Sequence, residues 1–273
     1  MQKFSKLMAV ALVALPVVSA QAALVLKLDS ANLSQIGTGG TAQTQWLDTS
    51  GNVNKALSNG WWDMFAITSN ATPTGQSAMD GSAAGNYSLK LTNPLASAAF
   101  TSAPTFTFFA VYKAAVNTAD HQMFFGGASN SASLRIDQSA AGATTSQFTL
   151  TRRNNSDAVS TLAGSVAADG WHVLSMTYDG VIGAGAIRMD GTPMALNHQP
   201  YINTFLAPIS EIGSAEGNTF KGQVAAIYMY DTVLSDSAVS TVESGMAATY
   251  TAVPEPTMLS LVGLAALGLM RRR

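Results

Sequence analysis

The stretch WHVLSMTYDG, residues 171–180, carries the clearest structural pattern in this chain of 273 residues. Its even-numbered residues fall on one side of an extended chain and its odd-numbered residues on the other, because side chains alternate along a strand. The Asp179-Gly180 pair at its end is typical of a tight turn. The stretch therefore predicts a β-strand that closes in a turn.

Similar short apolar or alternating runs recur through the chain between clusters of Gly, Asn, Asp, Ser and Thr, which is typical of a β-sandwich. Both faces of Gln223–Tyr230 are apolar, so we expect a central strand that is covered on both sides. No repeat or proline-rich linker divides this region, and residues 23–250 are predicted to form one all-β domain. The predicted strands are Leu24–Leu28, Gln45–Leu47, Asp63–Thr68, Ser88–Leu91, Thr105–Tyr112, Gln122–Phe125, Ser133–Asp137, Gln147–Thr151, Trp171–Tyr178, Ala186–Met189, Glu211–Gly213 and Gln223–Tyr230.

One short helix is predicted after the last strand. Ser235 is a suitable N-cap, and Asp236 places a negative charge in the first turn. Val239, Val242 and Met246 then recur at helical spacing. We expect this helix to pack beside the sandwich.

Composition excludes several classes of protein. Only 11% of the residues are charged, which excludes a charged disordered chain. The absence of cysteine excludes disulfides, thiolate zinc sites and a thiol nucleophile. A pI of 5.9 without a basic cluster in the body of the chain argues against a nucleic-acid partner.

The N-terminus has the three parts of a secretory signal peptide in order. Lys3 and Lys6 precede an apolar run over residues 7–18, and Ala20-x-Ala22 provides a small-residue cleavage pattern. We expect residues 1–22 to be removed and the mature chain to start at Ala23.

The C-terminal segment, residues 251–273, reads as a membrane anchor. Residues 257–270 are uncharged and would form a helix about 21 Å long, which only just spans a hydrocarbon core of about 30 Å. The terminal Arg271, Arg272 and Arg273 favour the cytoplasmic side. The body of the chain is therefore expected outside the inner membrane, held there by a C-terminal transmembrane helix.

The sequence Val253-Pro254-Glu255-Pro256, followed by an apolar segment and a terminal arginine cluster, resembles the PEP-CTERM sorting signal of Gram-negative bacteria. The resemblance implies that an exosortase, a membrane sorting enzyme, acts on Pro254, Glu255 and Pro256. It also implies a secreted or surface protein associated with exopolysaccharide and biofilm.

A second resemblance covers most of the exported part. Residues 24–29 with 46–52 are similar to the opening of laminin-G-like, concanavalin A-like jelly rolls, and residues 170–191 are similar to their middle. Residues 212–236 are similar to their end. The resemblance implies a jelly-roll sandwich of two antiparallel sheets. Members of this family bind sugars or calcium, cleave glycans or only adhere.

The net charge of the exported part limits the classes of ligand that it can be expected to bind. Residues 23–252 hold nine basic and 15 acidic side chains, a net charge of −6. Such a body suits a neutral polysaccharide or a divalent cation better than an anionic polymer.

We predict no catalytic site. A retaining glycanase needs two carboxylates about 5–5.5 Å apart. The body contains only Glu211, Glu216 and Glu243, without the Glu-x-Asp-x-Glu pattern, and its three histidines are scattered.

The candidate ligand-binding residues are Trp61 and Trp62. Neighbours on a strand point to opposite faces, so one indole can be exposed as a platform for a sugar ring. Packing of both indoles in the core is the alternative. We predict no metal site or cofactor; calcium at Asp80, Asp179 or Asp190 is the open alternative, although each precedes a glycine as turn aspartates do.

The leading function is therefore a non-catalytic protein of the cell envelope or extracellular matrix that binds exopolysaccharide. Two alternatives remain. One is a glycan hydrolase or lyase with a non-standard site, and the other is a purely structural matrix protein.

Overall fold

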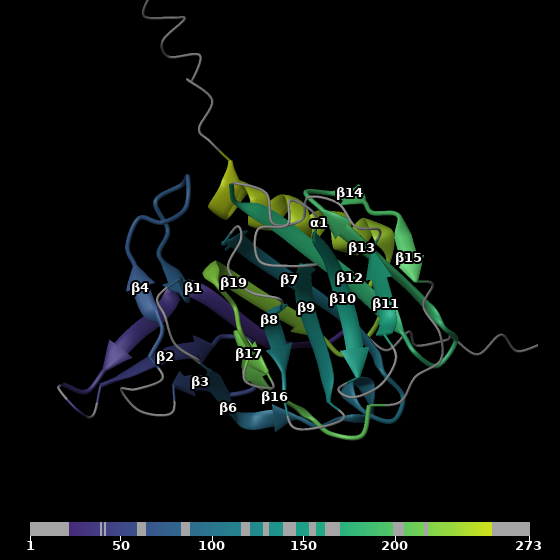
Figure 1. The fold of residues 1–273 in the computed structure, drawn as a ribbon, viewed down its shortest axis with the longest axis horizontal. Helices are drawn as coiled ribbons and strands as arrows, with labels where there is room; N and C mark the ends of the chain where they lie inside the picture. Colours follow the sequence, from purple (N-terminus) through teal and green to yellow (C-terminus); the bar gives the residue numbers. More distant parts are fainter. Residues whose placement is uncertain are drawn as a thin grey trace, which may run out of the picture.

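The computed structural model describes residues 22–38, 40, 42–58, 64–82, 88–115, 121–127, 131–138, 146–152, 157–161, 170–198, 205–215 and 218–252. Within these residues the chain forms two antiparallel β layers and one short α-helix (Figure 1). The expected all-β sandwich is confirmed. The predicted signal peptide up to residue 21 and the predicted transmembrane segment 257–270 lie outside the described residues.

The first layer is built around two apolar strands, β7 and β19. Strand β19 pairs with β1 on one side and with β7 on the other, and β7 pairs with β12, the strand of the opening sequence. The layer runs in the order β2 (Gln43–Asp48), β1 (Leu24–Ile36), β19 (Gly222–Tyr230), β7 (Thr105–Ala114), β12 (His172–Asp179), β13 (Ala184–Met189) and β14 (Thr192–Pro193), with β5 (Ala78–Asp80) and β4 (Ala66–Thr68) beside the start of β19.

The second layer faces the first and continues from it through the β2–β3 pairing. Its order is β3 (Lys55–Ser58), β6 (Leu89–Leu95), β16 (Ile209–Ile212), β8 (His121–Gly126), β9 (Ala132–Gln138), β10 (Ser146–Arg152), β11 (Asp157–Thr161) and β15 (Leu196–His198). Strands β17 (Ser214–Ala215) and β18 (Asn218–Thr219) form a separate small ladder, and η3 (Ala98–Phe100) is a 3₁₀ turn.

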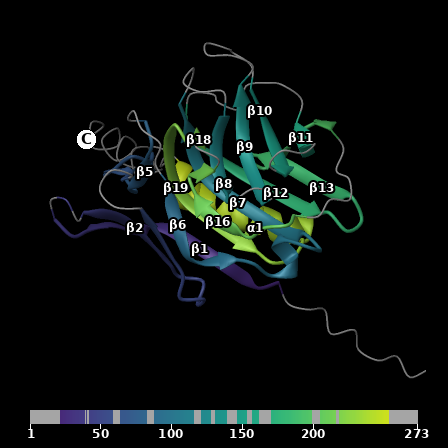
Figure 2. The same ribbon diagram turned by 60° about the horizontal axis from the view of Figure 1, so that its bottom comes forward.

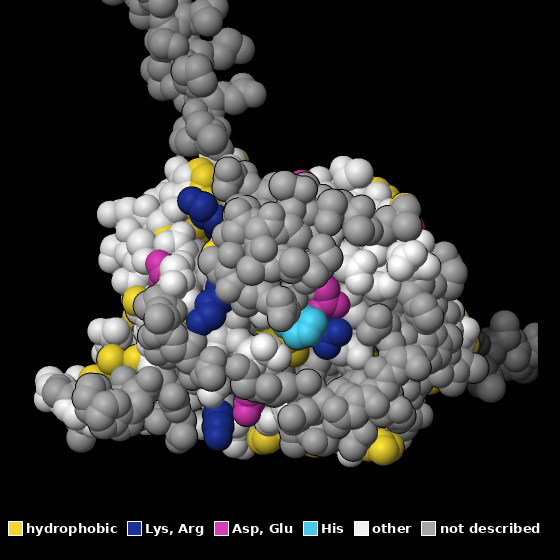
Figure 3. All heavy atoms as spheres, viewed as in Figure 1, with side chains coloured by type: hydrophobic (Ala, Val, Ile, Leu, Met, Phe, Trp, Pro, Cys, Tyr) yellow, Lys and Arg dark blue, Asp and Glu magenta, His cyan; other side chains and the backbone are white. Residues whose placement is uncertain are grey.

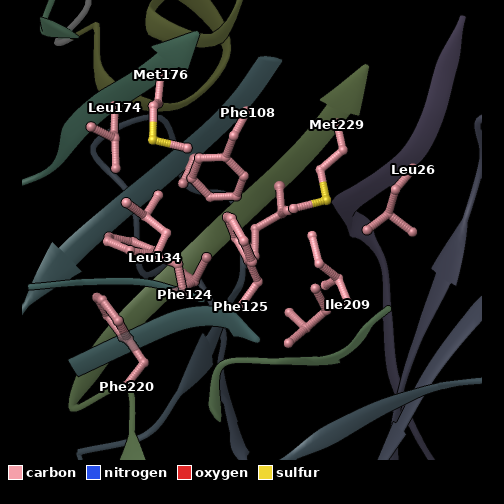
Figure 4. Packing of buried hydrophobic residues seen from close by; sticks show 14 of the residues in the cluster. Leu26, Phe108, Phe124, Phe125, Leu134, Leu174, Met176, Ile209, Phe220 and Met229 are labelled. Atoms are coloured by element: carbon pink, nitrogen blue, oxygen red, sulfur yellow. The ribbon is translucent and has the colours of Figure 1, made fainter. Parts of the chain in front are cut away.

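The main core lies between the layers and is rich in aromatic rings. Phe108 from β7 packs against Phe124 and Phe125 from β8, with ring centroids 5.9 and 5.0 Å away (Figure 4). Leu174 and Met176 of β12 point into the same core. The alternation seen in residues 171–178 therefore decides which side of β12 closes the sandwich.

A second, smaller apolar cluster lies on the outer face of the first layer. There Val173 and Phe109 pack with Val239 and Met246 of α1 (Asp236–Met246). Figure 2 shows α1 lying across the layer that contains β12 and β19. The predicted helix and its cap are confirmed, because the Ser235 hydroxyl accepts a hydrogen bond from the Ala238 N–H. Strand β19 is thus covered on both sides, as its two apolar faces predicted.

Two aspartate-glycine turns differ in conformation. Asp190 and Gly191 both have positive φ, 51° and 74°, as expected for the turn that closes β13 on β14. After β12 the positive φ falls on Gly183 rather than on Gly180, because the Asp179 carboxylate accepts hydrogen bonds from the N–H groups of residues 181 and 182 and widens that turn.

The last described turn, η4 (Ala247–Thr251), is fixed to the sandwich. The Tyr250 hydroxyl donates to Asp29 Oδ1 at 2.9 Å, and the Tyr228 hydroxyl donates to the same oxygen at 2.5 Å. Burial, followed by the neighbouring Asp29, raises the pKa of both tyrosines, so both stay protonated donors. No helix in the described part of the chain is long and apolar enough to cross a bilayer.

Candidate functional site

A pocket of 450 Å³ lies where α1 and η4 cross the outer face of β12 and β13. Its volume falls within the usual range for small-molecule sites. One wall is an indole, and most of the remainder is charged or carries a hydroxyl group. The lining residues are Trp171, Val173, Arg188, Asp190, Gly191, Ser240, Glu243, Ser244, Ala247 and Thr251.

A buried ion pair forms the floor of this α1–β12–β13 pocket. Glu243 is 5% exposed, although it belongs to a surface helix, because α1 turns this face to the sheet. Its Oε1 lies 3.1 Å from Arg188 Nε and accepts a hydrogen bond from the Ser175 hydroxyl at 2.5 Å. The Arg188 guanidinium also donates to the Gly191 carbonyl at 2.8 Å, which ties the floor to the β13–β14 turn.

Asp190 supplies a second carboxylate at the mouth of the pocket. One oxygen accepts from the Val173 N–H at 2.8 Å, and the other lies 2.7 Å from His172 Nδ1. Burial acts to raise the pKa of Asp190, but the hydrogen bonds from His172 and the Val173 N–H outweigh it, so the pKa is lowered. Asp190 is therefore an anion at neutral pH, and about half of its side chain is exposed.

Trp171 forms the aromatic wall. Its indole N–H donates to the Ala71 carbonyl at 3.0 Å, which fixes the ring in orientation. The ring packs against the small apolar cluster under α1, and the side chain is only half-buried. A fixed, half-exposed indole beside hydrogen-bonding groups can stack against the apolar face of a sugar ring.

The predicted site residues fall in three places. Trp61, Trp62, the motif Pro254-Glu255-Pro256 and the arginines 271–273 lie outside the described residues. Asp190 lines the pocket. Asp80 and Asp179 are the last residues of β5 and β12, and each accepts a hydrogen bond from a backbone N–H two residues later.

In the ranges that the structure describes, no three His, Cys, Asp or Glu side chains come together in a group that could hold a metal ion.

Arg188 and Glu243 were not predicted as site residues. In the sequence, Arg188 is only part of the stretch 170–191 that resembles the middle of the family domain, and Glu243 is one of three glutamates that lack the Glu-x-Asp-x-Glu pattern. The helical spacing of Val239, Val242 and Met246 places Glu243 on the same face of the helix, four residues after Val239 and three before Met246. That position was the available indication that this carboxylate faces the sheet.

A comparable His–Asp pair lies on the opposite layer. On β8 and β9, His121 Nδ1 and Arg135 Nε each lie 2.6 Å from Asp137 Oδ1. In the coloured part of the face in Figure 3, acidic and basic side chains lie interspersed. Asp137 thus provides a matched control for Asp190.

Acid should destabilise the domain through these carboxylates. Burial acts to raise the pKa of Asp137 and Asp190. Hydrogen bonds from His121 and from His172, with the charges of Arg135 and His172 respectively, outweigh it and lower both below the ordinary value. A carboxylate with a lowered folded-state pKa stabilises the fold above its unfolded pKa of about 3.9, and this contribution is lost as pH falls through the folded value.

We therefore expect the free energy of unfolding, measured with urea between pH 6 and pH 3, to fall toward low pH. Asp190→Asn and Asp137→Asn should each flatten the curve below about pH 4. An unchanged slope in both variants would contradict the assignment of ionised, hydrogen-bonded carboxylates.

Comparison with known proteins agrees with the fold. Residues 92–240 match the concanavalin A-like lectin/glucanases superfamily, and residues 252–273 match the PEP-CTERM protein-sorting motif. No curated protein matches the sequence.

Similar solved structures include the binding domain of botulinum neurotoxin DC in complex with rat synaptotagmin II, at a TM-score of 0.56 and 14% identity over 82% of this chain and 52% of that one. Another comes from a study of botulinum neurotoxin type C, whose cell entry depends on two ganglioside molecules; its TM-score is 0.55 at 13% identity, over 82% and 51% of the two chains. The chain thus spans about half the length of these solved structures. Since the matched region covers more than half of the sequence, the protein belongs to the concanavalin A-like lectin/glucanases superfamily and carries a PEP-CTERM sorting motif at its C-terminus.

Proposed function

We propose that this protein is exported to the cell surface or extracellular matrix and binds a neutral polysaccharide without cleaving it. The observation that carries the proposal is the α1–β12–β13 pocket. It combines one fixed indole with the hydroxyls of Ser240, Ser244 and Thr251 and the carboxylate of Asp190. Sugars present apolar ring faces and several hydroxyls, so this mixture of groups suits them.

Charge favours an uncharged ligand. The pocket is lined by one cation, Arg188, and by two carboxylates, Asp190 and Glu243. Arg188 and Glu243 pair with each other, which leaves the exposed charge of Asp190 to set the local potential. An acidic sugar would be repelled by this anion and by the net charge of −6 on residues 23–252.

The two carboxylates also argue for binding rather than hydrolysis. A glycosidase needs a general acid whose pKa is raised above the ordinary range. The pKa of Asp190 is instead lowered, since hydrogen bonds from His172 and Val173 outweigh the effect of burial. Glu243 Oε1 is already held by Ser175 and Arg188.

The similar solved structures support this proposal at the level of fold alone. The neurotoxin title above names gangliosides, and a further binding-domain structure, with a TM-score of 0.55 at 15% identity, was solved in complex with SialylT. This chain matches about half of each of these glycan-binding proteins, and a shared fold does not transfer a site.

The two ends of the chain carry the proposed export and sorting signals. We propose that residues 1–22 direct export and that an exosortase acts at Pro254-Glu255-Pro256 while residues 257–270 hold the chain in the inner membrane. Tyr250 is buried and anchored to Asp29, only four residues before Pro254. Four residues span at most about 14 Å, so processing would take place close to the surface of the folded domain.

Binding is tested with the exported protein on a glycan array, with and without calcium. We expect retention of neutral glycans that changes little with salt, because stacking depends weakly on charge. Asp190→Asn should weaken binding about tenfold, the usual effect of losing a charged hydrogen-bonding partner. Asp137→Asn, on the opposite layer, should bind as wild type, and equal loss in both variants would contradict the pocket assignment.

A glycan hydrolase or lyase is the second candidate, because two carboxylates, Asp190 and Glu243, do line one pocket. The same glycans, analysed after prolonged incubation, distinguish the two functions. Shortened products that disappear in Asp190→Asn would favour the enzyme. Glycans that are retained and stay intact throughout the incubation support binding without cleavage. If the array retains no glycan, a purely structural role in the matrix is the better explanation.

Sorting is tested by replacing Pro254, Glu255 and Pro256 together with alanine. We expect export to continue, because the N-terminal segment is unchanged, while the precursor accumulates in the membrane fraction. Cell fractionation and immunoblotting measure both steps. Normal release of the triple variant would show that the motif is not the processing signal.

A further inference from the structure

The predicted cleavage point lies directly before the first strand. The pattern Ala20-x-Ala22 predicts cleavage between Ala22 and Ala23, and β1 begins at Leu24. Ala23 is exposed, so the new terminus would lie at the surface of the sandwich. The inference below rests on the export signal proposed above.

The structure places a carboxylate against the nitrogen that cleavage would free. Ala23 N lies 3.1 Å from Asp231 Oδ1, although the two residues are 208 positions apart in sequence. In return, Asp231 N donates to the Ala23 carbonyl at 3.2 Å. These contacts lie just beyond the Leu24–Tyr230 pair, where β1 meets the end of β19.

We propose that Asp231 is the binding site for the N-terminal ammonium that signal-peptide removal creates at Ala23. Hydrolysis breaks the Ala22–Ala23 amide: the water oxygen joins the Ala22 carbonyl carbon, and that residue leaves as a carboxylate. The Ala23 nitrogen takes up the released protons and becomes an ammonium. A neutral N–H donor is thereby replaced, at the same position, by a cation beside an anion, which gives a stronger hydrogen bond.

The other charged groups nearby are already engaged. On β1, Lys27 Nζ pairs with Asp29 Oδ2 at 3.3 Å. At the end of β2, Asp48 accepts from the Lys27 N–H and from the Ser50 N–H and hydroxyl. Among these described carboxylates, Asp231 is the one that lies within hydrogen-bonding distance of Ala23 N.

The position of Asp231 beside Ala23 N links removal of the signal peptide to the pairing of β1 with β19. Strand β1 pairs with β19, which is among the last parts of the chain to cross the membrane. Cleavage during export can therefore precede β1–β19 pairing, and the finished domain gains an ion pair that the precursor lacks. An α-amino group has an ordinary pKa of about 7.7–8.0. Pairing with Asp231 raises the pKa of this amine in the folded state. The added stability is therefore fully present below about pH 7.7 and is lost as pH rises through the folded-state pKa.

The test uses full-length protein produced with its export signal in a Gram-negative host and purified after processing. Mass spectrometry reads the N-terminal residue. The protein is then treated with acetic anhydride at several pH values, and the mass of the N-terminal peptide gives the extent of acetylation. The pH dependence of this reaction gives the pKa of the terminal amine. Asp231→Asn is the test variant, and Asp236→Asn, in the first turn of α1, is the control.

We expect the chain to start at Ala23, with an amine pKa about 0.5 unit above the ordinary value and acetylation roughly twofold slower at pH 7.5. Asp231→Asn should abolish both effects, and Asp236→Asn should keep them. A different N-terminus would overturn the proposed processing site and this inference with it. An Ala23 terminus with an ordinary pKa, or with the same raised pKa in Asp231→Asn, would overturn the Asp231 assignment alone.

Discussion

Glu243→Ala is expected to lower the free energy of unfolding by about 3–5 kcal/mol, the usual cost of removing one partner of a buried ion pair. The carboxylate is nearly fully buried, and its loss leaves the Arg188 guanidinium without its counter-ion and the Ser175 hydroxyl without its acceptor. Urea denaturation followed by tryptophan fluorescence measures the effect.

A double variant separates the charge effect from packing. Arg188→Met combined with Glu243→Leu removes both charges and keeps the volume, so it should recover most of the lost stability. If the double variant is as unstable as the sum of the single changes, the two side chains do not act as a pair and the description of the pocket floor is wrong.

Gly222→Ala should destabilise the domain by about 4 kcal/mol or more, because the native backbone excludes a side chain. Gly222 begins β19 with a φ of 143°, and a Cβ atom there would lie 2.2 Å from the Lys113 carbonyl oxygen and 2.8 Å from Ala115 N. Relief would require β19 to move away from β7, the pairing at the centre of the first layer.

Gly245 supplies the matched control. It lies within α1, where a Cβ atom would meet nothing within 4 Å. Alanine is a better helix former than glycine, so Gly245→Ala should stabilise by about 0.5–1 kcal/mol. Thermal unfolding of both variants measures the contrast, and a Gly222→Ala protein as stable as wild type would contradict the close β7–β19 approach.

Most strands that the sequence predicts correctly are long enough to show alternation or a continuous apolar run; β4 and β16, with three and four residues, are the exceptions. Each of the 12 predicted segments has a counterpart in the structure, from β1 to β19. Strands β3 and β5 were missed, as were β11, β14, β15 and the β17–β18 ladder. Each holds two to five residues, which is too few for a periodic pattern, and their pairing depends on partners distant in sequence.

The pocket could be predicted only in part. The Asp190-Gly191 turn and the apolar stripe of α1 were each evident locally. The Arg188–Glu243 pair joins β13 to a helix 55 residues away, and nothing in either segment specifies that crossing. The sequence instead favours Trp61-Trp62 as the sugar-stacking residues, because two adjacent tryptophans form a recognisable local pattern. Trp171 becomes a pocket wall only through the helix that packs beside it, and its own segment does not indicate this.

The central claim is that a neutral glycan binds in the α1–β12–β13 pocket, and the indole N–H signal of Trp171 tests it most directly. The chain has four tryptophans, so a two-dimensional NMR spectrum should resolve four indole signals, with that of Trp171 identified by its loss in Trp171→Phe. Because this N–H is fixed on the Ala71 carbonyl, small changes at the pocket wall should shift it. We predict that a neutral glycan retained on the array shifts the Trp171 indole signal in a saturable manner and leaves the signal of buried Trp46 unchanged. A titration in which Trp171 stays fixed while the Trp61 or Trp62 signals move would contradict the account.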